Sequence, residues 1–95
     1  MSRPNRVWSV DVRITPRGGI LDPAGETIRR ALGNLGYDGV RSVRAGRLIR
    51  LEVEAEGPEA AQAATEKMCE QLIANPIIEN YVVRVREGRR MRGNG

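Results

Sequence analysis

The segment 20–36 constrains the fold of this 95-residue chain most, because it carries the start, one face and the end of a helix. Asp22 can accept hydrogen bonds from the unpaired N–H groups of a first turn, and Pro23 suits the first helical position. Gly36 suits the left-handed conformation that often follows a helix. These signals predict a helix from about Pro23 to Leu35. Its apolar residues recur at helical spacing: Ala24, Ile28, Ala31, Leu32 and Leu35.

Two glycines lie inside this predicted helix, at positions 25 and 33. Each weakens a helix by roughly 0.5–1 kcal/mol relative to alanine. One hypothesis is that another backbone segment approaches the helix closely at Gly25 and Gly33. The alternative is that packing holds the helix well enough to tolerate both residues.

Four segments are predicted to form strands, at about residues 7–15, 40–45, 48–55 and 78–86. Strict alternation places apolar side chains on one face of the longer three. The expected core residues are Trp8, Val10, Val12, Ile14, Ile49, Leu51, Val53, Ala55, Tyr81, Val83 and Val85. Leu48 and Val82 interrupt the charged opposite face, and a hairpin is expected at residues 45–47 because Gly46 can adopt a positive φ.

A second helix is predicted from about Pro58 to Ala74, where Asn75 and Pro76 end it. Its expected apolar stripe comprises Ala61, Ala64, Thr65, Met68 and Leu72. The resulting order is β-α-β-β-α-β. We therefore expect an α+β fold of the ferredoxin-like kind, a two-layer sandwich with both helices on one face of an antiparallel sheet.

The charge distribution predicts one domain, residues 7–87, between a flexible N-terminal tail (1–6) and a basic disordered tail (88–95). The net charge is +4, but the tails hold five of the sixteen basic residues and none of the twelve acidic ones. The domain itself is therefore nearly neutral. A single cysteine suits a reducing cytoplasm, and no apolar run has the length of a membrane span.

The sequence offers no set of residues typical of catalysis. It has no histidine, which excludes Ser–His and Cys–His nucleophile pairs, and no phosphate-binding loop with its lysine. Cys69 is expected to be a small core residue, since its neighbours include no cation that would activate a thiol. Alternating acids at positions 52, 54 and 56 are expected to lie on a solvated edge. We therefore predict neither a catalytic nor a metal site.

Arg41, Arg44, Arg47 and Arg50 gather around the expected hairpin and leave two hypotheses open. They could form an RNA-binding platform, or they could form a salt-bridged face between protein chains. RNA platforms on such sheets stack bases on aromatic side chains, whereas the alternation places Trp8 on the core face. The protein-contact hypothesis is therefore favoured.

Four separated motifs in register resemble one known family. They are Gly19–Gly25, Leu35–Tyr37, Val43–Arg47 and Leu72–Tyr81. In order and spacing, about residues 7–87 resemble PurS, the small subunit of phosphoribosylformylglycinamidine synthase.

The resemblance implies a subunit without its own active site or cofactor in a glutamine- and ATP-dependent ligase of purine (IMP) biosynthesis. A PurQ-type glutaminase would release ammonia, and a PurL-type synthetase would use ATP and Mg to activate the substrate amide. The small subunit would dimerise and bridge the two enzymes so that ammonia passes between them. No nucleic-acid or membrane partner is expected.

Partner contacts are expected, from the resemblance and the residue pattern, at Leu21, Asp22, Pro23, Gly25, Leu48, Arg50, Asn75, Pro76, Glu79 and Arg84. Self-association is expected either edge to edge or through the face that carries Leu48, Arg50, Glu52, Val82, Arg84 and Arg86. The alternative function is a small-molecule-sensing regulatory domain of the same topology, and RNA binding is a third.

Overall fold

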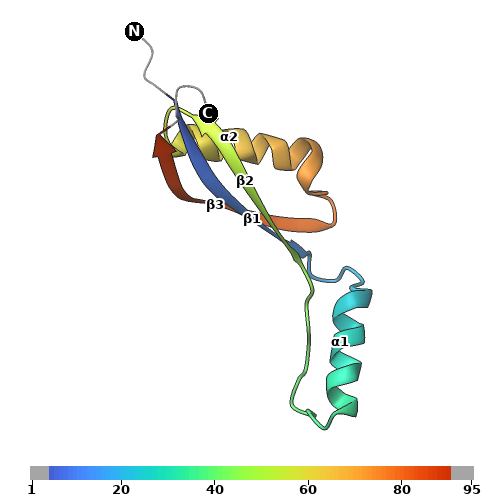
Figure 1. Ribbon diagram of the computed structural model, residues 1–95. Helices are drawn as coiled ribbons and strands as arrows, with labels where there is room; N and C mark the ends of the chain where they lie inside the picture. The colour runs from blue at the N-terminus through green and yellow to red at the C-terminus, as the bar shows by residue number, and fades with distance from the viewer. Residues whose placement is uncertain (1–4, 91–95) are drawn as a thin grey trace.

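The computed structural model describes residues 5–90, and the side chains of residues 5–88. Along this part of the chain the elements are β1 (Arg6–Pro16), α1 (Pro23–Asn34), β2 (Arg47–Ala55), α2 (Pro58–Met68), a π-helical turn η1 (Cys69–Ile73) and β3 (Glu79–Arg90) (Figure 1). The fold is α+β, as predicted, and the described residues form three strands rather than four.

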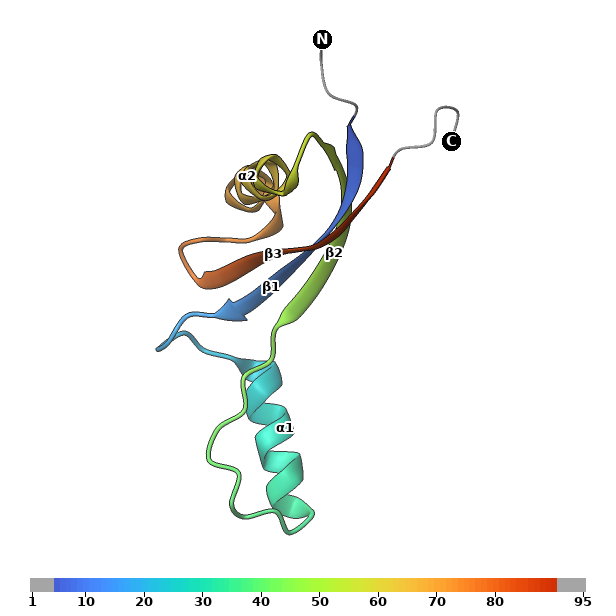
Figure 2. The ribbon, with the colours of Figure 1, turned by 90° about the vertical axis from the view of Figure 1, so that its left-hand side faces the viewer.

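The three strands form one antiparallel sheet in the order β2-β1-β3, so the first strand lies in the middle. Val12 of β1 lies opposite Ile49 of β2 and Val83 of β3. The predicted alternation is confirmed, because Val10, Val12 and Ile14 are fully or almost fully buried. The helix α2 covers this face of the sheet (Figure 2). The opposite face, which we call the open face, is not covered by any helix among residues 5–90 (Figures 1 and 2).

The predicted sandwich with two helices on the sheet is wrong for this chain. Helix α1 extends away from one end of the sheet, and the extended segment 37–46 returns beside it (Figures 1 and 2). The chain is elongated, with extents of 61 × 27 × 18 Å and a radius of gyration of 18.1 Å. A compact domain of about 100 residues has a radius of gyration near 13 Å.

The expected strand at 40–45 and hairpin at 45–47 are also absent, because the chain runs straight from this segment into β2. Gly46 does not adopt a positive φ. Instead, a Cβ atom at position 46 would lie 2.3 Å from the carbonyl oxygen of Ile14. The glycine therefore permits a close approach between β2 and the end of β1, not a reversal of the chain.

The second helix is shorter than predicted, because its last turn widens. The N–H of Ala74 donates to the carbonyl oxygen of Cys69, five residues earlier, at 3.1 Å. A π turn advances the helical face by one residue. The prediction that Leu72 faces the core is consequently wrong, since its side chain is 86% exposed, while Cys69 and Ile73 contact the core instead.

The last strand is longer than predicted. Because β1 begins at Arg6, it offers pairing partners for β3 as far as Arg90. Residues 88–90 therefore belong to the sheet rather than to a disordered tail. Gly88 lies against Trp8, where a Cβ atom would come 2.5 Å from the indole ring. The rest of the predicted tails, residues 1–4 and 91–95, lies outside the described residues.

Candidate interaction surfaces

Helix α1 and the residue before it carry several exposed large apolar side chains. Of its twelve residues only Gly25 is buried. Ile28 is 46% exposed and Leu35 is 74% exposed, and Leu21 just before the helix is 84% exposed. Contiguous apolar surface of this kind is typical of a protein–protein interface. We call Leu21, Ile28, Leu32 and Leu35 the α1 face.

The start of α1 is held by one carboxylate. Asp22 accepts hydrogen bonds from the N–H of Gly25 and the N–H of Ala45, both at 3.0 Å, so it caps the helix and ties it to the returning segment. These two backbone bonds, that of Gly25 first, lower the pKa of Asp22. The N-cap prediction is confirmed, and Pro23 occupies the first turn.

The close-approach hypothesis holds for one of the two helical glycines. A Cβ atom on Gly25 would lie 2.3 Å from the carbonyl oxygen of Val43. A Cβ atom on Gly33 would meet nothing within 4 Å in this chain. Gly25 therefore lets the segment 37–46 pass against the first turn of α1, while Gly33 has no such role here.

The turn before β3 lies next to the start of β2. Glu79 accepts from the N–H of Asn75 at 2.8 Å and pairs with Arg47 at 3.0 Å, and the Asn75 bond and then Arg47 lower the pKa of Glu79. Arg17 donates to the carbonyl oxygen of Pro76 at 2.9 Å. A hollow of about 210 Å³ is lined by Asp22 and Ala24 at the start of α1 and by Arg47 and Glu79 beside the sheet. Of the predicted contact residues at 22–25 and 75–79, Asp22 and Glu79 thus line the same hollow.

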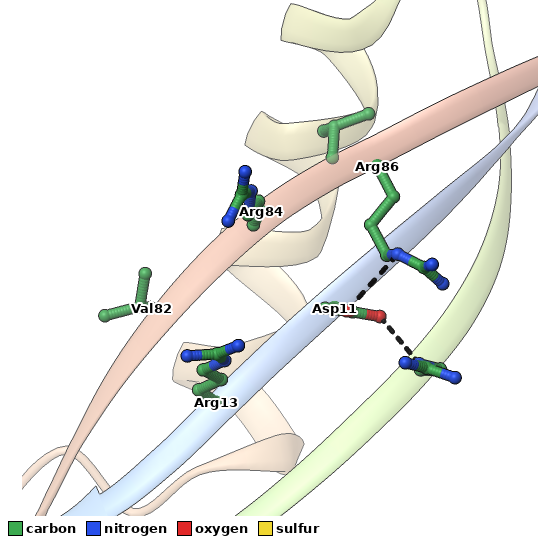
Figure 3. Close-up of a pocket in the computed structure, with 7 residues that line it drawn as sticks. Asp11, Arg13, Val82, Arg84 and Arg86 are labelled. Carbon is green, nitrogen blue, oxygen red and sulfur yellow. Dashed lines mark hydrogen bonds and ion pairs between the residues drawn. The ribbon is translucent and has the colours of Figure 1, made fainter.

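The open face carries the remaining predicted contact residues. Asp11 accepts from Arg50 Nε at 3.2 Å and lies 3.6 Å from Arg86 Nε (Figure 3). A hollow of about 510 Å³ on this face is lined by Asp11, Arg50 and Arg84, among others. Leu48 is 52% exposed, and Arg84 is also exposed. The predicted orientation of Leu48, Arg50 and Arg84 is confirmed, while their contact with a partner stays a prediction.

The arginines expected around a hairpin do not form one cluster. Arg44 donates to the carbonyl oxygens of Pro16 and Arg17, at 3.3 and 3.5 Å. Arg47 and Arg50 pair with acids at different places on the sheet. Since the hairpin is absent, these cations are spread along an extended stretch.

The two reactive side chains of the core are held in their neutral forms. Cys69 is fully buried, and burial, followed by the charges of Glu66 and Glu70, raises the pKa of its thiol. Tyr81 donates to a Glu70 carboxylate oxygen at 2.5 Å, which raises the pKa of the phenol to about 12. Neither group is poised to act as a nucleophile or base near neutral pH.

Residues 5–90 offer neither a metal site nor a membrane-spanning helix. No three histidine, cysteine, aspartate or glutamate residues among them are grouped so as to hold a metal ion. None of their helices is long and apolar enough to cross a membrane.

We predict that the Cys69 thiol is inert in the folded chain. At about pH 8, alkylation by iodoacetamide should be far slower in the folded chain than after unfolding in guanidinium, since burial disfavours the thiolate. Cys69→Ala should lower the free energy of unfolding by about 1 kcal/mol and leave the function of the chain intact. Equal alkylation rates in the two states would contradict the assignment of Cys69 to the core.

Sequence reasoning missed Asp11 and Arg13 as members of the open-face cluster, and Arg47 as the partner of Glu79, whereas Arg86 was assigned to this face. The alternation did assign Asp11 and Arg13 to the face opposite the core. What it did not give was the register that places them beside Arg50 and Arg84.

The sequence matches a family model, PurS, described as phosphoribosylformylglycinamidine (FGAM) synthase, over residues 9–87. This range includes β2, both helices and most of β1 and β3. The chain belongs to the PurS family. It is therefore a subunit of phosphoribosylformylglycinamidine synthase, an enzyme of purine biosynthesis.

Relatives and solved structures agree with this assignment. The PurS subunit of the synthase from Synechocystis is 46% identical over 81 residues, with 83% of this chain and 81% of that protein covered. The PurS subunit of Thermotoga maritima has a crystal structure that superposes with a TM-score of 0.79 at 38% identity, covering 86% and 94% of the two chains. The present chain also matches a chain in the structure of PurLQS from Thermotoga maritima, with a TM-score of 0.76 at 39% identity. The match covers 84% of the present chain and 98% of that chain.

Proposed function

We propose that this chain is a non-catalytic bridge in the cytoplasm between a PurQ-type glutaminase and a PurL-type synthetase. The synthetase would hold ATP and Mg, and the bridge would keep ammonia on a short path between the two enzymes. Restricting a reactive small molecule in this way is a proximity effect that also limits its loss to water. The similarity to a chain in PurLQS from Thermotoga maritima supports this choice of partners.

The observation that carries the proposal is the uncovered α1 face. A bridge must present protein-binding surface in more than one direction, and α1 stands clear of the sheet (Figure 2). Its side chains Ile28 and Leu35 are exposed. The open face of the sheet presents a second surface of different chemistry, rich in arginine (Figure 3).

We further propose that the α1 face binds a second copy of this chain. In a dimer, α1 of one copy would lie beside α2 on the sheet of the other. Ile49 and Leu51 of β2 are only partly buried in the single chain, so this sheet face has apolar surface left to cover. Two chains would then complete the two-helix sandwich that the sequence of one chain predicts.

Reconstitution tests the bridging role. The synthetase and glutaminase subunits should form the amidine product from glutamine only when this chain is added, while ammonia supplied directly should support the reaction without it. Full glutamine-dependent turnover in the absence of this chain would refute the proposal.

A further inference from the structure

The open face of the sheet carries more arginine side chains than the neighbouring acid can pair with. Arg13, Arg50, Arg84 and Arg86 surround a single acid, Asp11, which contacts Arg50 and Arg86. Within the described residues, Arg13 and Arg84 form no ion pair or hydrogen bond. Two guanidinium groups are thus free to bind a carboxylate bidentately.

The strand register places this cluster in rows across the sheet. In one row, Asp11 lies between Arg50 and Arg84. In the next, Arg13 lies between Leu48 and Val82, which are 52% and 63% exposed. Arginine flanked by exposed aliphatic side chains is typical of the centre of a protein–protein interface.

The row on the other side of Asp11 carries acidic side chains, which limit how long a bound anion can be. There Ser9 lies between Glu52 and Glu87. The carboxylate of Glu87 would repel a long polyanion that continued across the face. Trp8 packs on the opposite face of the sheet, so the described open face offers no aromatic side chain for base stacking. A ligand with a few carboxylates and some apolar surface fits better than RNA.

We infer that the face formed by Arg13, Leu48, Val82 and Arg84 docks a short acidic segment with apolar side chains, belonging to a partner subunit of the synthase. Its carboxylates would pair with Arg13 and Arg84, and its apolar side chains would cover Leu48 and Val82. This inference rests on the proposed bridging function, because it names the surface through which one partner enzyme is held.

The test compares two doubly neutralised variants of the full chain. Arg13→Gln with Arg84→Gln removes the two free cations of the open face. Arg6→Gln with Lys67→Gln removes the same charge at two exposed positions away from it. The affinity of each variant for the purified synthetase and glutaminase subunits is measured at low and at moderate salt, with circular dichroism to verify folding.

The open-face variant should bind one of the two enzyme subunits at least about tenfold more weakly than the wild type at low salt, with a shallower salt dependence. The control variant should bind as the wild type does. If the wild type binds its partners and both variants bind equally well, the docking inference is wrong while the bridging function stands. If the wild type binds neither enzyme, the bridging function itself fails.

A labelled single-stranded RNA provides the other arm of the test. The wild type should not bind it at moderate salt. Binding of this probe that disappears in the open-face variant, together with unchanged binding of the enzyme subunits, would overturn the inference in favour of a nucleic-acid surface.

Discussion

Ile28→Glu should convert the self-associated chain into a monomer at micromolar concentration. Ile28 lies in the middle of the α1 face and is already 46% exposed in the single chain, so glutamate there is compatible with the fold of one copy. In the proposed dimer it would be buried without a cationic partner, which costs several kcal/mol. Since each 1.4 kcal/mol is a factor of ten, the dimer dissociation constant should rise by roughly a hundredfold or more. Sedimentation velocity measures the change.

Ala63→Glu is the matched control for this experiment. It introduces the same charge on the exposed side of α2, four residues before Lys67, where a favourable i, i+4 pair can form. This variant should sediment as the wild type does. A wild type that runs as a monomer near 10.5 kDa at every concentration would overturn the dimer and leave the α1 face without its proposed partner.

The loss of the dimer should also lower the activity of the reconstituted enzyme. If the bridge is built from two copies, Ile28→Glu should reduce glutamine-dependent turnover in the reconstituted complex while leaving ammonia-dependent turnover unchanged. Unchanged glutamine-dependent turnover by a variant that sediments as a monomer would show that one copy is sufficient for bridging.

Local patterns predicted the three observed strands and the helix starts of this chain because their causes are local. The alternation from Val7 to Thr15 places side chains on opposite faces wherever the strand is docked. Asp22 caps α1 through an N–H three residues away, a contact that needs no tertiary structure. These elements could therefore be read from the sequence with nearly correct bounds.

The position of α1 could not be read in this way. An apolar stripe on a helix specifies that the helix packs against something, and it does not specify which chain supplies that surface. Gly46 can serve either a hairpin with a positive φ or a close backbone approach. Only the contact with the Ile14 carbonyl in the folded chain distinguishes the two.

The candidate surfaces were likewise predicted in part. Leu48, Arg50 and Arg84 were assigned to one face by alternation alone. Their gathering around Asp11 depends on the register between β1 and its two neighbours, which is set by long-range pairing. The π turn that exposes Leu72 was not predicted either, because an i to i+5 bond leaves no residue pattern in the sequence.

Gly25→Ala and Gly33→Ala should change the stability of the chain in opposite directions. An added Cβ at position 25 would lie 2.3 Å from the Val43 carbonyl oxygen and 2.6 Å from a carboxylate oxygen of Asp22. The first of these atoms belongs to the backbone and cannot rotate away, so the segment 37–46 must separate from α1. Overpacking of this kind costs about 1–3 kcal/mol. The capping bond between Asp22 and the Gly25 N–H would be strained at the same time.

At position 33 the same methyl group meets open space. Alanine should therefore stabilise the helix by about 0.5–1 kcal/mol, the usual difference between the two residues inside a helix. For a domain of this size each 1 kcal/mol moves Tm by roughly 4–8 °C, so thermal unfolding separates the two variants. Destabilisation by Gly33→Ala would mean that another backbone, from a second copy or a partner, approaches α1 at that position. Stabilisation by Gly25→Ala would show that the segment 37–46 does not lie against the first turn of α1. It would also contradict the hydrogen bond from the Ala45 N–H to Asp22 that links this segment to the helix.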